Sequence, residues 1–258
     1  MKIGNVTWDE QSKHYYYTGI DAVALYVWDG SWYGAPNAWN GVTAINEAPS
    51  GAESNKLYAD NIEYLNLLSK EEFGLTLECY QTPKDVYDND SQSWIKGFDA
   101  CDGIKKDDTG LIKVRGQTRA TFGLVYRVLK GSDTVEAGGA VAGNTKGNGY
   151  IYHVVYGCKA SPSSRDFATV NDSPEAQTMS FEITTTPLTD TTKLPTSSGT
   201  PLFTSVAHLE IDGSKLGVYT GSGTPTNGTI QALEAALFGG SSMPDPKAIA
   251  TACGYTSN

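Results

Sequence analysis

The chain has 258 residues, with 29 acidic side chains against 19 basic ones and a formal net charge of −10 at pH 7. This charge argues against nucleic acid or an anionic membrane as a partner, because Lys and Arg supply most of the affinity for phosphate groups. Aromatic residues make up 10% of the chain, which excludes a wholly disordered polypeptide. The length is sufficient for one large domain with a substantial core.

The amino-terminal residues 1–6 contain no apolar stretch of signal-peptide length. The longest apolar run, residues 22–28, is shorter than the roughly 20 residues that cross a bilayer. We therefore expect a soluble protein made in the cytosol. In that compartment we expect reduced, packed cysteines rather than disulfides or metal ligands, since no CxxC pair occurs among Cys79, Cys101, Cys158 and Cys253.

In chain order, residues 1–20 lack periodicity and are expected to form an arm, residues 21–240 the main domain, and residues 241–258 a carboxy-terminal tail. The main domain opens with a β-rich run, 21–28, which ends at a turn dipeptide. Four aromatic residues are then crowded together: Trp28, Trp32, Tyr33 and Trp39. Such a group can be a sugar-binding platform, but it more often anchors a core or an interface.

The segment 39–80 carries an excess of negative charge. It breaks at residues 49–51 and ends in two strand-like runs, the second with Phe73, Leu75, Leu77 and Cys79 at alternate positions. Two lysines, Lys56 and Lys70, stand against seven acids: Glu47, Glu53, Asp60, Glu63, Glu71, Glu72 and Glu78. Such a one-sided charge indicates either a functional surface or an acidic face that is simply solvated.

Two long loop excursions are expected, at residues 82–118 and 131–149. The first mixes acids with a weak excess of bases and is interpreted as a solvated loop, with a contact to a neighbouring subunit as the second interpretation. The second contains six glycines, but no lysine follows them where a phosphate-binding loop needs one. Alternating patterns predict further strands over four segments: 121–129, 150–159, 177–187 and 203–211.

Only residues 229–238 predict a helix, with Asn227 or Thr229 as its cap and Gly239-Gly240 as its end. The expected fold is therefore mainly β, a sandwich or barrel with one flanking α-helix and long loops.

No arrangement of residues indicates catalysis. A G-x-S-x-G nucleophile motif is absent, and His14, His153 and His208 are isolated in the sequence, so a zinc site is not predicted. Glu71 and Glu72 are adjacent, and on a strand they would point to opposite faces. We therefore predict no catalytic, cofactor-binding or metal-binding residues, and no enzyme activity.

Several sequence blocks resemble the major tail protein, or tail-tube protein, of long non-contractile-tailed bacteriophages. The blocks follow the order of that family: WNGVTAINEAPSGAE at 39–53, LYADNIEYLNLLSKEEFG at 57–74, FDACDG at 98–103, FGLVYR at 122–127, and YIYHVVYGCKASPSSRDFATVNDSPEAQTMSFEITTTP at 150–187. The chain departs from the family pattern at residues 82–97, which look longer, and at 131–149 and 212–228, which match loosely.

The resemblance implies a tail-tube-type β-sandwich with a flanking helix, which assembles into hexameric rings that stack into a hollow tube for genome DNA. It implies a location in the virion tail after synthesis in the bacterial host cytoplasm. The implied partners are further copies of the chain, a tape measure protein inside the tube, and tail terminator and initiator proteins. No catalytic residue or cofactor is implied.

Two hypotheses combine this resemblance with the charge pattern. An acidic lumen would let DNA pass without binding, and its candidate residues are Glu63, Glu72, Glu78, Glu182 and Glu210. Candidate contacts between subunits are Trp39, Pro49, Glu53 and Tyr58, together with the arm 1–19. The competing interpretations are a carbohydrate-binding β-sandwich module and an enzyme with a diffuse site.

Overall fold

The computed structural model describes residues 2–3, 5–7, 14–51, 53–69, 71–89, 92–107, 110–113, 118–132, 149–162, 169, 176–188, 194–195, 201–202 and 206–255. Its centre is an open antiparallel sheet of eight strands in the order β4-β3-β13-β14-β15-β8-β5, with β18 also paired to β14. These strands are β3 (Tyr15–Val27), β4 (Asn37–Ala38), β5 (Val42–Glu47), β8 (Gly74–Cys79), β13 (Phe122–Ser132), β14 (Tyr150–Ala160), β15 (Met179–Thr185) and β18 (His208–Asp212).

The remaining strands form small antiparallel pairs outside this sheet. The pairs are β1 (Lys2–Ile3) with β2 (Val6–Thr7), β6 (Ser54–Ala59) with β7 (Ile62–Leu68), β9 (Val86–Asp88) with β10 (Ser93–Ile95), β11 (Ile104–Asp107) with β12 (Gly110–Lys113), and β16 (Leu194–Pro195) with β17 (Pro201–Leu202). The helical elements are η1 (Gly213–Lys215), α1 (Ile230–Phe238) and α2 (Pro246–Ala252).

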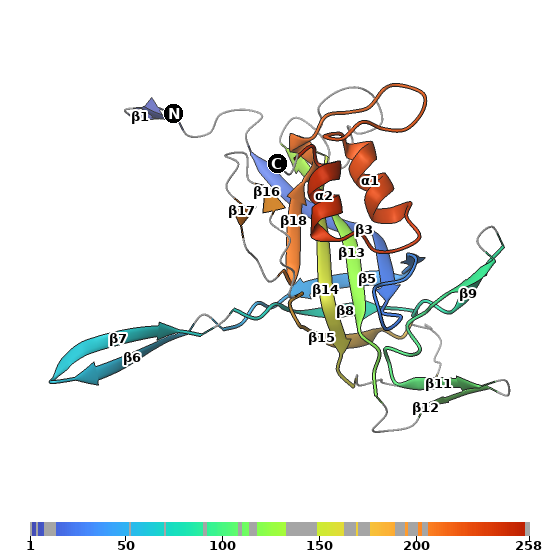
Figure 1. Cartoon of the computed structure of the whole chain (residues 1–258), viewed down its shortest axis with the longest axis horizontal. Helices are drawn as coiled ribbons and strands as arrows, with labels where there is room; N and C mark the ends of the chain where they lie inside the picture. Colours follow the sequence, from blue (N-terminus) through green and yellow to red (C-terminus); the bar gives the residue numbers. More distant parts are fainter. Residues whose placement is uncertain are drawn as a thin grey trace.

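Strand β14 divides the sheet into two layers. Its first half, Ile151–Val155, pairs with β18, whereas its end, Cys158–Ala160, pairs with β15. Between them Gly157 has a φ of +66°, a conformation that glycine adopts without a steric penalty. The sheet bends there, so that β5, β8 and β15 lie across β3, β13, β14 and β18 (Figure 1).

The crossing of the layers gives two separate cores, and the second half of β3, residues 23–27, is buried on both faces together with much of β13 and β14. Val23 and Leu25 alternate with Ala24 and Tyr26 along β3: the first pair packs between the two layers and the second against the helices. Leu233 and Leu237 of α1 and Ile249 of α2 close the helix-side core. The fold is thus two crossed β-layers with a helical layer on one side.

Both helices have sequence signals at their start. The Thr229 side chain accepts a hydrogen bond from the Ala232 N–H, which confirms the predicted cap and helix. The second helix, α2, lies within the segment 241–258 that is expected to be a carboxy-terminal tail, so that expectation is wrong for residues 246–252. Asp245 caps it and Pro246 occupies its first turn, two ordinary start signals that the sequence does contain.

The mainly-β prediction is confirmed, and the sheet forms a sandwich-like fold and no closed barrel. The predicted alternation is confirmed in β8 and β15, where Leu75, Leu77, Phe181 and Ile183 are buried. The four cysteines are free thiols, and three of them are buried.

Other predicted segments are only partly described. The predicted strand at 203–211 is described as β18 from His208 onward, while residues 203–205 lie outside the described part. The predicted loop 82–118 contains the hairpins β9–β10 and β11–β12. Residues 133–148 of the second predicted loop lie outside the described residues, as do residues 1, 4 and 8–13 of the predicted arm 1–20. The expected boundary of that arm is wrong, because residues 15–20 begin strand β3 and pair with β13 in the central sheet.

The bend at Gly157 gives a direct test of this architecture. A Cβ at Gly157 would lie 1.9 Å from the Thr186 carbonyl oxygen, so Gly157→Ala is expected to lower the free energy of unfolding by more than about 2 kcal/mol. At Gly34 the nearest atom to an added Cβ is 3.5 Å away, so Gly34→Ala should change stability by less than about 0.5 kcal/mol. Urea unfolding followed by tryptophan fluorescence measures both, and equal effects would contradict the proposed bend.

Candidate functional site

A two-stranded arm, defined as β6 and β7 (residues 54–68), projects far from the body of the protein (Figure 1). Its turn consists of Asp60 and Asn61, which both have positive φ values, of 53° and 62°. Two consecutive left-handed residues make the type I′ turn whose twist suits a β-hairpin. Within the described residues, neither strand of the arm pairs with the central sheet.

The arm has one polar face and one apolar face. Lys56 and Glu63 form an ion pair of 2.8 Å, and the Ser54 hydroxyl donates to the Asn66 side-chain oxygen on the same face. A register shift at Leu57/Tyr58 keeps this polar face continuous. The pairing register places the apolar residues on the other face: Leu57 and Leu65, which are opposite each other, with Ile62 and Leu67.

This apolar face has no cover within the described structure. The exposed fractions are 43% for Leu57, 64% for Ile62, 46% for Leu65 and 47% for Leu67. An isolated two-stranded hairpin is marginally stable in water, and clustered exposed apolar side chains mark interaction surfaces. The arm therefore has the properties of a binding element that is completed by a partner.

The four predicted contact residues fall into two groups. Tyr58 lies on the arm and is 68% exposed, and Pro49 and Glu53 are exposed where the chain enters the arm. Trp39 is different: it is only 2% exposed, packs on Phe98 and donates its indole N–H to the Gln81 carbonyl. Its position in the core leaves almost no indole surface for a neighbouring subunit.

The five predicted lumen acids do not share one surface. Glu78 of β8 and Glu182 of β15 lie on the outer face of the layer formed by β5, β8 and β15. The buried residues Leu77 and Phe181 lie on the other face of this layer. The others are spread over the molecule: Glu63 on the arm, Glu72 at its base and Glu210 on β18. Of the five predicted lumen acids, only Glu78 and Glu182 therefore lie near each other on one face.

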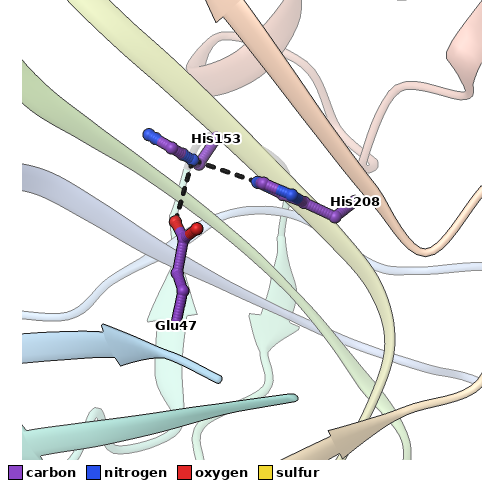
Figure 2. A group of neighbouring side chains, drawn as sticks. All are labelled: Glu47, His153 and His208. Atoms are coloured by element: carbon purple, nitrogen blue, oxygen red, sulfur yellow. Dashed lines mark hydrogen bonds and ion pairs between the residues drawn. The ribbon is translucent and has the colours of Figure 1, made fainter. Parts of the chain in front are cut away.

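A second feature lies at the base of the arm, where Glu47, His153 and His208 converge (Figure 2). His153 Nδ1 is 3.0 Å from His208 Nε2 and 3.1 Å from Glu47 Oε1. The expectation that the histidines are isolated is wrong for these two residues. They are 55 positions apart in sequence, and only the pairing of β18 with β14 brings them together.

Strand register directs all three side chains into the space between the two layers. Glu47 is opposite Leu75 of β8, and His208 is opposite Val155 of β14, both of which belong to the core between the layers. His153 is opposite Tyr126 of β13, which faces the same core. Residues paired across a ladder share a face, so the cluster joins the last residue of β5 to the other layer.

Aromatic rings hold the two imidazoles in place. The Tyr126 ring is nearly parallel to that of His153, with centroids 4.6 Å apart, and the Phe73 ring packs on that of His208 at 4.2 Å. The Tyr126 hydroxyl donates a 2.5 Å hydrogen bond to Glu47 Oε1. The carboxylate and both rings are thus fixed before any ligand binds.

The cluster also changes the acidity of its members. The hydrogen bond from His153, followed by that from Tyr126, lowers the pKa of Glu47 to about 2 against the opposing effect of burial. Burial lowers the pKa of His208, because the charged imidazolium loses its hydration. Glu47 is therefore ionised at neutral pH.

Of the four crowded aromatic residues, Tyr33 belongs to the helix-side core, and Trp28 and Trp32 are partly buried against it. Trp32 donates its indole N–H to the Met243 carbonyl at 2.7 Å, and the Tyr33 hydroxyl accepts a hydrogen bond from the Gly157 N–H. The rings of Trp28, Trp32 and Tyr33 meet at steep angles, between 57° and 83°. They do not form a flat exposed platform of the kind that stacks on a sugar.

No protein-family model matches the sequence, and no curated protein matches it. Among solved structures, a chain of the anti-feeding prophage (AFP) baseplate, determined by cryo-EM with 6-fold symmetrisation, is similar over 69% of this chain and 92% of that chain, with 9% identity and a TM-score of 0.31. A TM-score this low does not establish a common fold. Within the described residues, no helix is both long enough and apolar enough to span a membrane.

The low pKa of Glu47 predicts how stability depends on pH in metal-free protein. The folded pKa of about 2 lies below the usual 4.5, so the contribution of Glu47 is complete above about pH 4.5 and is lost as the pH falls toward 2. We expect Glu47→Gln to lower the unfolding free energy by about 1–2 kcal/mol at pH 7, a value reduced by solvent screening of the partly exposed side chain. Near pH 2 the two proteins should converge. Denaturant titrations at both pH values test this, and an equal difference at the two pH values would contradict it.

Proposed function

We propose that this protein is a structural subunit of a bacteriophage particle, and specifically a tail-tube protein that self-associates into stacked hexameric rings. The observation that carries the proposal is the arm, whose apolar face has no partner within the subunit. The resemblance of several sequence blocks to the major tail proteins of long non-contractile-tailed phages is a separate support for the proposal. On this proposal the protein works by association and performs no covalent chemistry.

The occupant of the apolar face is a second copy of this chain. A protein that forms the wall of a tube contacts mainly itself, and the arm projects well beyond the body, where it can reach a neighbour (Figure 1). On this proposal the arm docks on a different part of the neighbouring subunit, so the contact is heterologous and can either close into a ring or continue along a tube. Burial of Leu57, Ile62, Leu65 and Leu67 supplies the driving force.

The proposed tube conducts genome DNA, and its inner surface must therefore not bind phosphate. Net charge of −10 favours such a surface. Glu78 and Glu182 are the best candidates for it, because they project from the same outer face of the β8–β15 pair. The proposed partners besides the chain itself are the tape measure protein, the tail terminator and the initiator, and the proposed location is the virion tail after synthesis in the host cytoplasm.

Electron microscopy of the purified protein at increasing concentration tests the proposal. Rings or tubes are the expected result. Monodisperse particles of one subunit at every concentration, together with retention on a polysaccharide column, would instead favour the carbohydrate-binding module.

A matched pair of arm variants tests the role of the apolar face. Leu65→Asp places a carboxylate in the proposed interface and should raise the concentration needed for assembly by more than roughly tenfold, because an unpaired buried charge costs more than about 1.4 kcal/mol. Asn66→Asp introduces the same residue on the polar face, where it can still accept the Ser54 hydrogen bond. Sedimentation velocity of both variants gives the comparison. Equal assembly of the two variants would exclude the apolar face as the contact.

A second pair of variants tests whether Glu78 and Glu182 face the proposed DNA passage. Tubes of a Glu78→Lys/Glu182→Lys variant should retain double-stranded DNA at low salt and release it as salt increases, since the new lysines pair with phosphates. The Glu78→Asp/Glu182→Asp control keeps the charge and should retain no more DNA than wild type. Co-sedimentation of labelled DNA with tubes measures this. If the lysine variant forms tubes that retain no DNA, these positions do not face the passage.

A further inference from the structure

The cluster of Glu47, His153 and His208 resembles a coordination shell in both composition and spacing. Two of the three separations between its ligand atoms are 3.0 and 3.1 Å, and all three atoms lie within 4.8 Å of one another. A tetrahedral zinc site with bonds of 2.0–2.1 Å has neighbouring ligand atoms about 3.3 Å apart. Small side-chain movements are thus sufficient for all three atoms to reach one ion.

We propose that Glu47, His153 and His208 form a binding site for a divalent transition-metal ion of the Zn²⁺ type. Two imidazoles and one carboxylate suit Zn²⁺, Co²⁺ and Ni²⁺, whereas Mg²⁺ and Ca²⁺ favour all-oxygen shells. Three protein ligands leave one tetrahedral position for water. The side chain of Glu47 is 35% exposed, which gives an ion a route from solvent to the site.

The surroundings of the cluster are those of a supported metal site. The Tyr126 hydroxyl holds the Glu47 carboxylate, as second-sphere groups hold metal ligands. The rings of Tyr126 and Phe73 pack against the two imidazoles and restrict their rotation. Folding therefore already restricts the three ligand side chains, so little further conformational entropy is lost when an ion binds.

Metal binding requires a change of tautomer. Without metal, the 3.0 Å contact between His153 Nδ1 and His208 Nε2 requires a proton on one of the two nitrogens. The cation takes the lone pairs of both nitrogens, so the ring that carried this proton must hold it on its other nitrogen, and two neutral imidazoles bind the ion without net release of acid. The two imidazoles, which meet almost in parallel at 7°, must also tilt toward the ion.

The position of the site gives it a structural role. Its ligands come from β5, β14 and β18, so an ion would fasten the edge strand β5 to the opposite layer. Glu47 is the last residue of β5 and precedes the segment that enters the arm. Bound metal would therefore stabilise the base of the arm, and this holds whether or not the protein forms tubes.

The test uses tag-free full-length protein, stripped with EDTA and exchanged into metal-free buffer. Isothermal titration with Zn²⁺ should give one site with a dissociation constant of micromolar or lower. Zn²⁺ should also raise the midpoint of thermal unfolding by several degrees, because it binds only the folded state. A Co²⁺ titration followed by visible absorption should show a four-coordinate spectrum.

Variants locate the site. Glu47→Gln and His208→Asn should each weaken Zn²⁺ binding by at least about 100-fold, and Tyr126→Phe, which alters only a positioning residue, by about 10–100-fold with the stoichiometry unchanged. His14→Asn, which changes an exposed histidine outside the cluster, should bind as wild type does. Circular dichroism of each apo variant checks that it is folded. No saturable binding by wild type, or unchanged affinity in both His208→Asn and Glu47→Gln, would show that the cluster is a hydrogen-bonded network only and overturn the proposal.

Discussion

A two-stranded ribbon cannot bury its own side chains, because it has no second layer to place against either face. In the body of this protein a second layer is present on both sides of the central strands. One core lies between the crossed layers, and another lies beneath α1 and α2. The arm has no such second layer within the described structure, and Leu57, Leu65 and Leu67 are exposed to water. The body of the molecule thus buries its apolar side chains, whereas the arm exposes them. The hydrophobic effect therefore favours the binding of a partner that covers the apolar face of the arm.

Local patterns in the sequence predicted much of the body. Alternation identified β8 and β15 with their buried faces, and helical spacing with a threonine cap identified α1. These features depend on neighbours along the chain, which is why the sequence is sufficient for them. The helix α2 was missed because it is short, although Asp245 and Pro246 mark its start.

The candidate sites depend on contacts that are distant in sequence and could not be predicted in the same way. His153 and His208 meet only because β14 changes partners at Gly157 and leaves its first half free to pair with β18. In the arm, the register shift at Leu57/Tyr58 decides which side chains share a face, and simple alternation gives the wrong set beyond it. Trp39 was predicted at an interface from its aromatic character, but Phe98 and Gln81 enclose it.

The central claim is that the apolar face of the arm is covered by another copy of the chain. Amide hydrogen exchange of residues 54–68, measured by mass spectrometry in dilute and in concentrated protein, tests it most directly. The account predicts rapid exchange of the arm in dilute solution and strong protection once subunits associate, while the amides of β13 and β14 stay protected in both conditions. Equally rapid exchange of the arm at every concentration, in particles that have associated, would contradict it.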